Sequence, residues 1–281
     1  MTMWDFPCSD PIDISIDSWA SGSIAVAGEP TDTVVVEVVP SRRSNGADLL
    51  DQVEVEFDDG QLYVRGPRAL TFRRRSGLDL TIKAPAGSSC AAKTASADVS
   101  CVGTLSAAAL TTASGDLSAQ LVTGDVTVRS ASGDVLLGQV GGDLTVHTSS
   151  GDVNAGQVEG AVRINSASGD VTIGYCADAV TMRTASGDVQ LGAVVSGEVD
   201  LSSASGDVAV AVVPGIGVYL DLSSNSGSVR SELDEVDADE AAGTADAAVE
   251  IRVRTVSGDI RITKSATDRR DTQSATPAPA E

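Results

Sequence analysis

The sequence predicts an all-β protein folded as a parallel β-solenoid, a single-stranded β-helix with about 18 residues and two short strands in each coil. One acidic phrase returns at a fixed step along the middle of the chain, and a weaker copy lies halfway through each step. The composition has 28 glycines and only 3% aromatic residues, so the core must consist of small and β-branched side chains. A thin stack of coils suits such a core.

The repeated phrase is TASGDV or SASGDV, and it runs from Thr94 to Val208. Its halfway copies include TGDV, ending at Val126, and GGDL, ending at Leu144. Self-similarity at a short fixed period indicates a repeat architecture. The acidic residues of the main copies are spaced by 18 residues five times and then by 19: Asp98, Asp116, Asp134, Asp152, Asp170, Asp188 and Asp207.

Each coil is predicted to carry two strands whose apolar side chains point inward, because side chains alternate along a strand. Val135 and Leu137 share a face in one half of a coil, and Val126 and Val128 do so in the other half. Cys101 takes the same inward position, where a thiol behaves as a small apolar side chain. Neither half buries its apolar face alone, so we expect coils stacked about 4.8 Å apart.

Residues 12–95 are predicted to form an irregular β cap whose SGSIAV segment, at 21–26, resembles a degenerate first coil. The DDGQ segment at Asp58–Gln61 predicts a hairpin turn. Period-2 alternation marks six strands in this region: Ile12–Asp17, Ile24–Ala27, Val34–Val39, Val53–Phe57, Leu62–Arg65 and Leu78–Lys83.

Regularity weakens after Val210, where an acidic insertion separates the last two copies of the phrase. Alternation resumes at Val249, and we interpret 249–264 as a terminal cap whose outward Arg252, Arg254 and Arg261 oppose edge-to-edge association. The predicted organisation has six parts: a flexible N-terminus (1–11), an irregular β N-terminal cap (12–95), the regular solenoid (96–230), an acidic insertion loop (231–248), C-terminal capping strands (249–264) and a disordered tail (265–281).

The formal net charge of -21 disfavours nucleic acids and anionic membranes as partners. The four cysteines have no metal-binding or redox spacing, and free thiols fit a reducing compartment. The N-terminal segment lacks the pattern of a secretory signal, and no apolar run is long enough to span a bilayer. We therefore expect a cytoplasmic protein without membrane insertion and without a cofactor.

Two interpretations of the repeated aspartates are open. In the first, Gly turns the corner while Asp and the preceding Ser or Thr bond to nearby backbone N–H groups. In the second, the stacked carboxylates form a row of Ca²⁺ sites, although the spacing departs from the calcium-binding nonapeptide G-G-x-G-x-D-x-U-x. The candidate metal ligands are Asp116, Asp134, Asp152, Asp170 and Asp188.

The outward positions of the second strand give the candidate partner-binding residues Arg129, His147, Arg163 and Arg183. His147 is the only histidine of the chain, so a Ser-His-Asp triad would depend on one outward imidazole. We therefore predict no catalytic residues. A second basic cluster lies in the N-terminal region and fits either an anionic ligand or a solvated face: Arg42, Arg43, Arg65, Arg68, Arg73, Arg74 and Arg75.

The SGSIAV strand, the segment RRRSGLDLTIKAPAGSS at 73–89 and the serial TASGDV and SASGDV coils resemble a bacterial β-strand-repeat family, domain of unknown function 4097, whose members are often labelled adhesins. The resemblance covers roughly Ile12 to Thr263 and implies a β-solenoid of stacked parallel strands.

The function expected from these features is that of a non-catalytic scaffold or adhesin-like binding protein, which docks a protein or polymer on the flat outer faces of its sheets. The alternatives are a glycan-acting β-helix enzyme and a cation-binding repeat protein. A deep cleft with converging polar groups would favour the enzyme.

Overall fold

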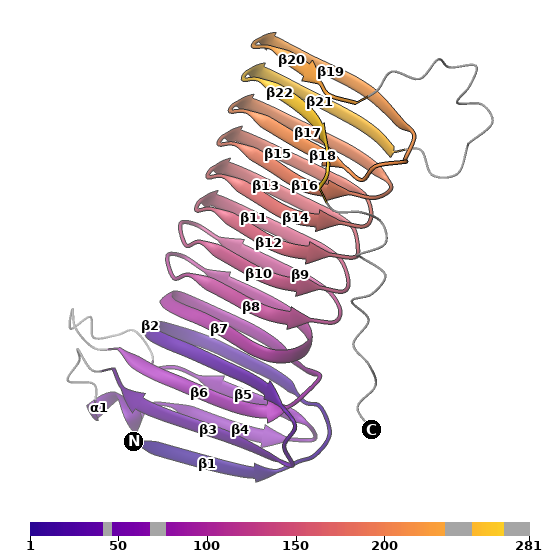
Figure 1. Cartoon of the computed structure of the whole chain (residues 1–281). Coiled ribbons are helices and arrows are strands. Elements are labelled where there is room, and N and C mark those ends of the chain that lie inside the picture. Colours follow the sequence, from indigo (N-terminus) through magenta and orange to yellow (C-terminus); the bar gives the residue numbers. More distant parts are fainter. Residues whose placement is uncertain (42–46, 68–76, 234–248, 267–281) are drawn as a thin grey trace.

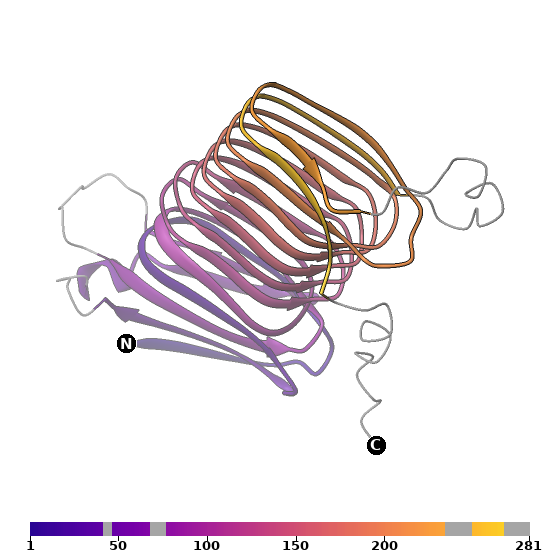
Figure 2. The same ribbon diagram turned by 45° about the horizontal axis from the view of Figure 1, so that its top comes forward.

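The computed structural model describes residues 1–41, 47–67, 77–233 and 249–266. It confirms the predicted all-β parallel solenoid, in which the coils stack along one long axis (Figures 1 and 2). One short helix, α1 (Ala47–Leu50), lies near the N-terminal end. No helix in the described ranges is long and apolar enough to cross a membrane.

Each regular coil adds one strand to each of two parallel sheets, and the long strand β7 (Ser88–Thr112) enters both. The first sheet continues through β8 (Leu117–Val122), β10 (Val135–Val140), β12 (Val153–Val158), β14 (Val171–Cys176), β16 (Val189–Val194) and β18 (Val208–Val212). The second sheet continues through β9 (Val126–Ser130), β11 (Leu144–Ser150), β13 (Val162–Ser168), β15 (Val180–Ser186) and β17 (Glu198–Ser205).

The core lies between these two sheets and follows the predicted alternation. Val135, Leu137, Val126 and Val128 are all buried, as is Cys101. The first strand also buries a third apolar side chain near the corner of the coil, which the sequence analysis did not identify: Val122, Val140, Val158, Cys176, Val194 and Val212. Burial raises the pKa of the Cys176 thiol to about 12, so this thiol stays protonated and acts as a core side chain.

The N-terminal part is built on β2 (Asp13–Glu29), which joins two of the predicted strands into one. It pairs in parallel with β7, so the SGSIAV segment is indeed the coil below β7, and β7 crosses the predicted boundary at 95/96 without a break. The strands β5 (Gln61–Arg65) and β6 (Leu78–Pro85) also pair in parallel with β2.

The N-terminal end of the solenoid is closed by antiparallel strands. These are β3 (Thr33–Pro40) on β6, β1 (Thr2–Pro7) on β3 and β4 (Glu54–Asp58) on β5, the last pair forming the predicted hairpin. The prediction of a flexible N-terminus at 1–11 is therefore wrong for β1, because its backbone pairs along β3. The rings of Phe6 and Phe57 stack with centroids 5.0 Å apart.

The C-terminal end does not follow the order of the sequence. Strand β21 (Val249–Ser257) lies between β17 and β19 (Val218–Ser226), and β22 (Ile260–Lys264) lies between β18 and β20 (Val229–Ser231). Figure 1 shows this yellow coil below the orange coil that ends the stack. The prediction that 249–264 caps the solenoid is therefore wrong: the terminal coil is β19 and β20. Of the predicted insertion at 231–248, residues 234–248 lie outside the described residues, as do residues 267–281 of the predicted tail at 265–281.

Candidate functional site

The repeated aspartates form a hydrogen-bonded ladder that links one coil to the next, and this confirms the backbone role. Each carboxylate accepts a hydrogen bond through Oδ1 from the backbone N–H of the aspartate one coil further along. The donor–acceptor distances are 2.8–3.0 Å, with carboxylate acceptors on Asp98, Asp116, Asp134, Asp152, Asp170, Asp188 and Asp207. These bonds to anionic acceptors offset the repulsion between stacked carboxylates.

The predicted calcium ligands Asp116, Asp134, Asp152, Asp170 and Asp188 all belong to this ladder. One oxygen of each is thus committed to a neighbouring backbone. Within the described part of the chain, no group of three or more His, Cys, Asp and Glu side chains is arranged to hold a metal ion.

The ladder crosses the inserted coil and ends in the terminal one. The Oδ1 atom of Asp207 accepts from the N–H of Asp259, and the Oδ1 atom of Asp259 accepts from the N–H of Ser228, 2.8 Å in each case. The bond from Ser228 lowers the pKa of the Asp259 carboxyl, with a smaller contribution from Arg230 and Arg261. The terminal coil has a serine where the coils from Asp98 to Asp259 have an aspartate.

The predicted partner-binding residues lie on the outer face of the second sheet, in two neighbouring columns. The register aligns Arg129, His147, Asn165 and Arg183 in one column on β9, β11, β13 and β15. Arg163 aligns instead with Thr145 and Thr181 in the adjacent column. Its guanidinium lies 3.7 Å from Asp143, an exposed pair that contributes little to stability.

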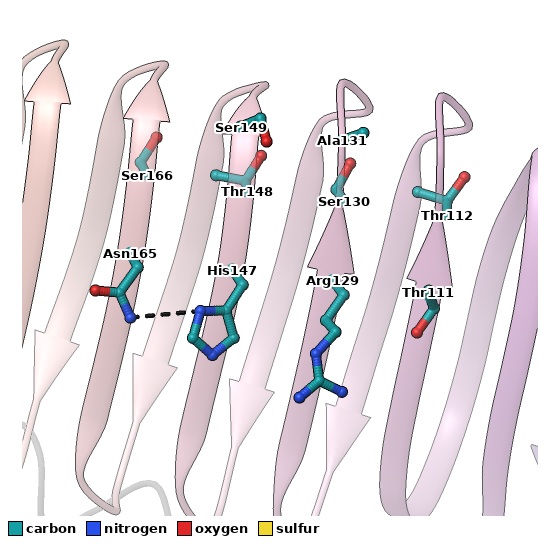
Figure 3. A pocket seen from close by; sticks show the side chains of 10 residues that line it. All are labelled: Thr111, Thr112, Arg129, Ser130, Ala131, His147, Thr148, Ser149, Asn165 and Ser166. Atoms are coloured by element: carbon teal, nitrogen blue, oxygen red, sulfur yellow. Dashed lines mark hydrogen bonds between the residues drawn. The ribbon is translucent and has the colours of Figure 1, made fainter.

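A shallow groove of about 420 Å³ borders this column between β9 and β13. Figure 3 shows Arg129, His147 and Asn165 side by side on three consecutive strands, with the amide Nδ2 of Asn165 3.4 Å from Nδ1 of His147. The rest of the lining is made of small side chains on these strands, their corners and the preceding strand β7: Thr111, Thr112, Ser130, Ala131, Thr148, Ser149 and Ser166. Arginine, imidazole and amide groups together offer several donors and one or two acceptors.

The groove coincides with a change in the shape of the corner. In the β9 coil the strand ends at Ser130, whose Oγ accepts from the N–H of Gly133 at 2.8 Å. The next strand of the second sheet, β11, runs on to Ser150, and the corner after it places Gly151 at φ 149°. Thr148 Oγ1 and Ser166 Oγ are buried at this change and have no hydrogen-bond partner among the described residues.

This groove is not predictable from the sequence, because the local sequence carries no signal for it. The phrase SASGDV occurs at 130–135 and again at 166–171. The first copy forms the Ser130 to Gly133 corner, whereas the second continues as strand to Ser168 and has Gly169 at φ 127°. The difference therefore depends on the neighbouring coils.

Of the N-terminal arginines, only Arg65 lies in a described range. Its guanidinium is 3.1 Å from Glu54 and lies over the ring of Tyr63, so it is paired on the strand surface. Arg42, Arg43, Arg68, Arg73, Arg74 and Arg75 lie outside the described residues.

Comparison with known proteins gives a family match and several similar folds. A "putative adhesin" from Bacteroides fragilis is 15% identical, with 93% of this chain and 96% of that chain covered and a TM-score of 0.44. A "putative lipid binding protein" from Parabacteroides distasonis is 13% identical, with 94% and 96% covered and a TM-score of 0.47. No curated protein matches the sequence. The family model Toastrack DUF4097 matches residues 13–263, and the chain therefore belongs to this family.

Proposed function

We propose that this protein is a non-catalytic binding module that docks a neutral, hydroxyl-rich polymer on the outer face of its second sheet. The observation that supports this most directly is the straight column of Arg129, His147, Asn165 and Arg183 beside the groove. Parallel register fixes these side chains at the strand spacing of about 4.8 Å, so the column is a rigid row of polar contacts.

The charges around the column support a partner that accepts hydrogen bonds without carrying a high charge. In the described part of the chain, neither Arg129 nor Arg183 forms an ion pair, so both guanidinium groups are available to a ligand. The net charge of -21 repels a polyanion as it approaches. A neutral polymer of hydroxyl groups satisfies the donors of the column without that repulsion.

The non-catalytic part of the proposal rests on how the acidic side chains are used. The serial carboxylates hold neighbouring coils together through Oδ1, so their regular recurrence has a structural cause. Most glycoside hydrolases use a pair of carboxylic groups that flank one bond of the substrate. The groove is lined instead by Arg, His, Asn, Thr, Ser and Ala.

The test is affinity electrophoresis of the full chain through gels that contain a neutral polysaccharide, such as dextran, xylan or a β-glucan, or the acidic polymer polygalacturonate. We expect retardation by a neutral polymer and at least a tenfold weaker interaction for the double variant Arg129→Ala, Arg183→Ala. The double variant Lys93→Ala, Arg261→Ala, which removes two positive charges outside the column, is the matched control. Migration unaffected by every polymer, or equal retardation of the double variant, would overturn the proposal.

A further inference from the structure

The C-terminal end of the solenoid leaves its core partly uncovered. Inward side chains of the inserted coil, such as Ile251 and Ile260, are at most 1% exposed. Their partners one coil further are less well covered: Leu220 is half-buried and Val229 is 44% exposed. Because no described strand pairs with the outer edges of β19 and β20, the end also presents unpaired backbone groups.

The opposite end of the molecule has a different surface, so copies cannot stack head to tail as a continuous parallel solenoid. Antiparallel strands close the N-terminal end, with β1 and β4 outermost. The terminal coil also ends the ladder, because Ser228 has no carboxylate to offer to a further coil. A second copy of this chain that pairs with this end therefore has to meet it with its own terminal coil, in antiparallel pairing.

The open edge of β20 is complementary to itself. Residues 228 and 232 bond to β22, through the C=O of Ser228 and the N–H of Glu232. Backbone groups alternate in direction along a strand, so those of Val229 and Ser231 point away from β22. The N–H of Leu233, just beyond the strand, donates to Oγ of Ser231 and would exchange that bond for one across the pair. An antiparallel pair centred on Ser231 places Arg230 opposite Glu232 of the other copy, twice, and Val229 opposite Leu233, twice.

We propose that two copies of this chain join end to end through their terminal coils, with β20 pairing antiparallel to β20 about a two-fold axis at Ser231. Such a contact uses the same patch on both copies, so it closes at two. The end is only one coil wide, which makes the contact small and the dimer dependent on concentration. Pairing of the edge, burial of Val229 and the two Arg230–Glu232 contacts favour it. This inference is independent of the proposed binding face.

The test is sedimentation equilibrium of the full chain over a range of concentrations and at low salt. We expect the mass to rise from 28.4 kDa toward twice that value. Arg230→Glu and Glu232→Arg should each weaken the dimer at least tenfold, because each places like charges opposite one another. The double variant Arg230→Glu, Glu232→Arg should restore the dimer. Lys93→Glu, at an exposed position of β7 far from the terminal coil, is the matched control, and thermal unfolding checks that each variant folds.

Three results would overturn the proposal. A monomer at every concentration would mean that the terminal coils do not pair. A mass that grows beyond two copies would mean an open-ended contact. Dimerisation that is unchanged in both single variants would place the contact elsewhere on the molecule.

Discussion

The inserted coil and the terminal coil are aligned residue for residue, yet they differ in how much of their surface is covered. Strands β21 and β22 have a neighbouring coil on both sides, whereas β19 and β20 have one on a single side. The sequence reflects this difference, because Ser228 and Ser231 of the terminal coil align with Asp259 and Ile262 of the inserted one. Burial in a solenoid is therefore set by position in the stack as well as by the alternation of the strand.

The largest difference in the free energy of unfolding should come from truncating the core side chain at one aligned position, in the inserted coil and separately in the terminal coil. Ile251→Ala removes a side chain that is fully buried between two coils, and we expect a loss of about 2–5 kcal/mol in the free energy of unfolding. Leu220→Ala, its partner in the terminal coil, should cost about 1 kcal/mol because the side chain is only half-buried. Urea unfolding followed by circular dichroism measures both, and equal losses would contradict the comparison.

A second contrast uses glycines at the same end. Gly258 has φ 149°, and a Cβ there would lie 2.0 Å from the carbonyl oxygen of Gly206. Gly258→Ala should therefore cost about 1–3 kcal/mol. Gly217, before β19, has open space around it, so Gly217→Ala should leave stability unchanged or raise it by up to about 1 kcal/mol. A similar melting temperature for the two variants would mean that the corner relaxes freely.

The link between the two coils should depend on pH. The bond from Ser228 lowers the pKa of Asp259, so the folded state favours the ionised carboxyl. Its contribution is present above the unfolded pKa of about 3.9 and is lost as the pH falls through the lower folded value. At pH 7 we expect the wild type to have a higher melting temperature than the Asp259→Asn variant. The difference between the two melting temperatures should shrink below about pH 4. Asp10→Asn controls for the loss of one charge, and a gap that persists at pH 2 would refute this assignment.

The smallest effect concerns calcium. Because ladder carboxylates such as Asp188 commit Oδ1 to a neighbouring backbone, we expect the same melting temperature with millimolar Ca²⁺ and with a chelator. The Asp188→Asn variant, which keeps the Oδ1 acceptor, should likewise have the same melting temperature with calcium and with a chelator. A clear calcium-dependent rise in the wild type that is lost in Asp188→Asn would revive the cation interpretation.

The period of the acidic phrase was enough to predict the solenoid, the two strands per coil and the inward position of residues such as Val135, because these depend on local alternation. The order of the last coils was not predictable in this way. Strand β21 carries the same alternation as its neighbours, and only its contacts with both β17 and β19 place it inside the stack. The groove beside His147 is equally hidden, since identical SASGDV phrases form different corners.

The placement of the inserted coil also separates the order of synthesis from the order of assembly. A ribosome completes β19 and β20 before it makes residues 249–264. Until that later segment arrives, the upper surface of β17 and β18 has no covering layer, and the terminal coil has no neighbour to rest on. The nascent solenoid can therefore grow coil by coil as far as β18, while its last two coils form together, as one cooperative step, after residues 249–264 have emerged.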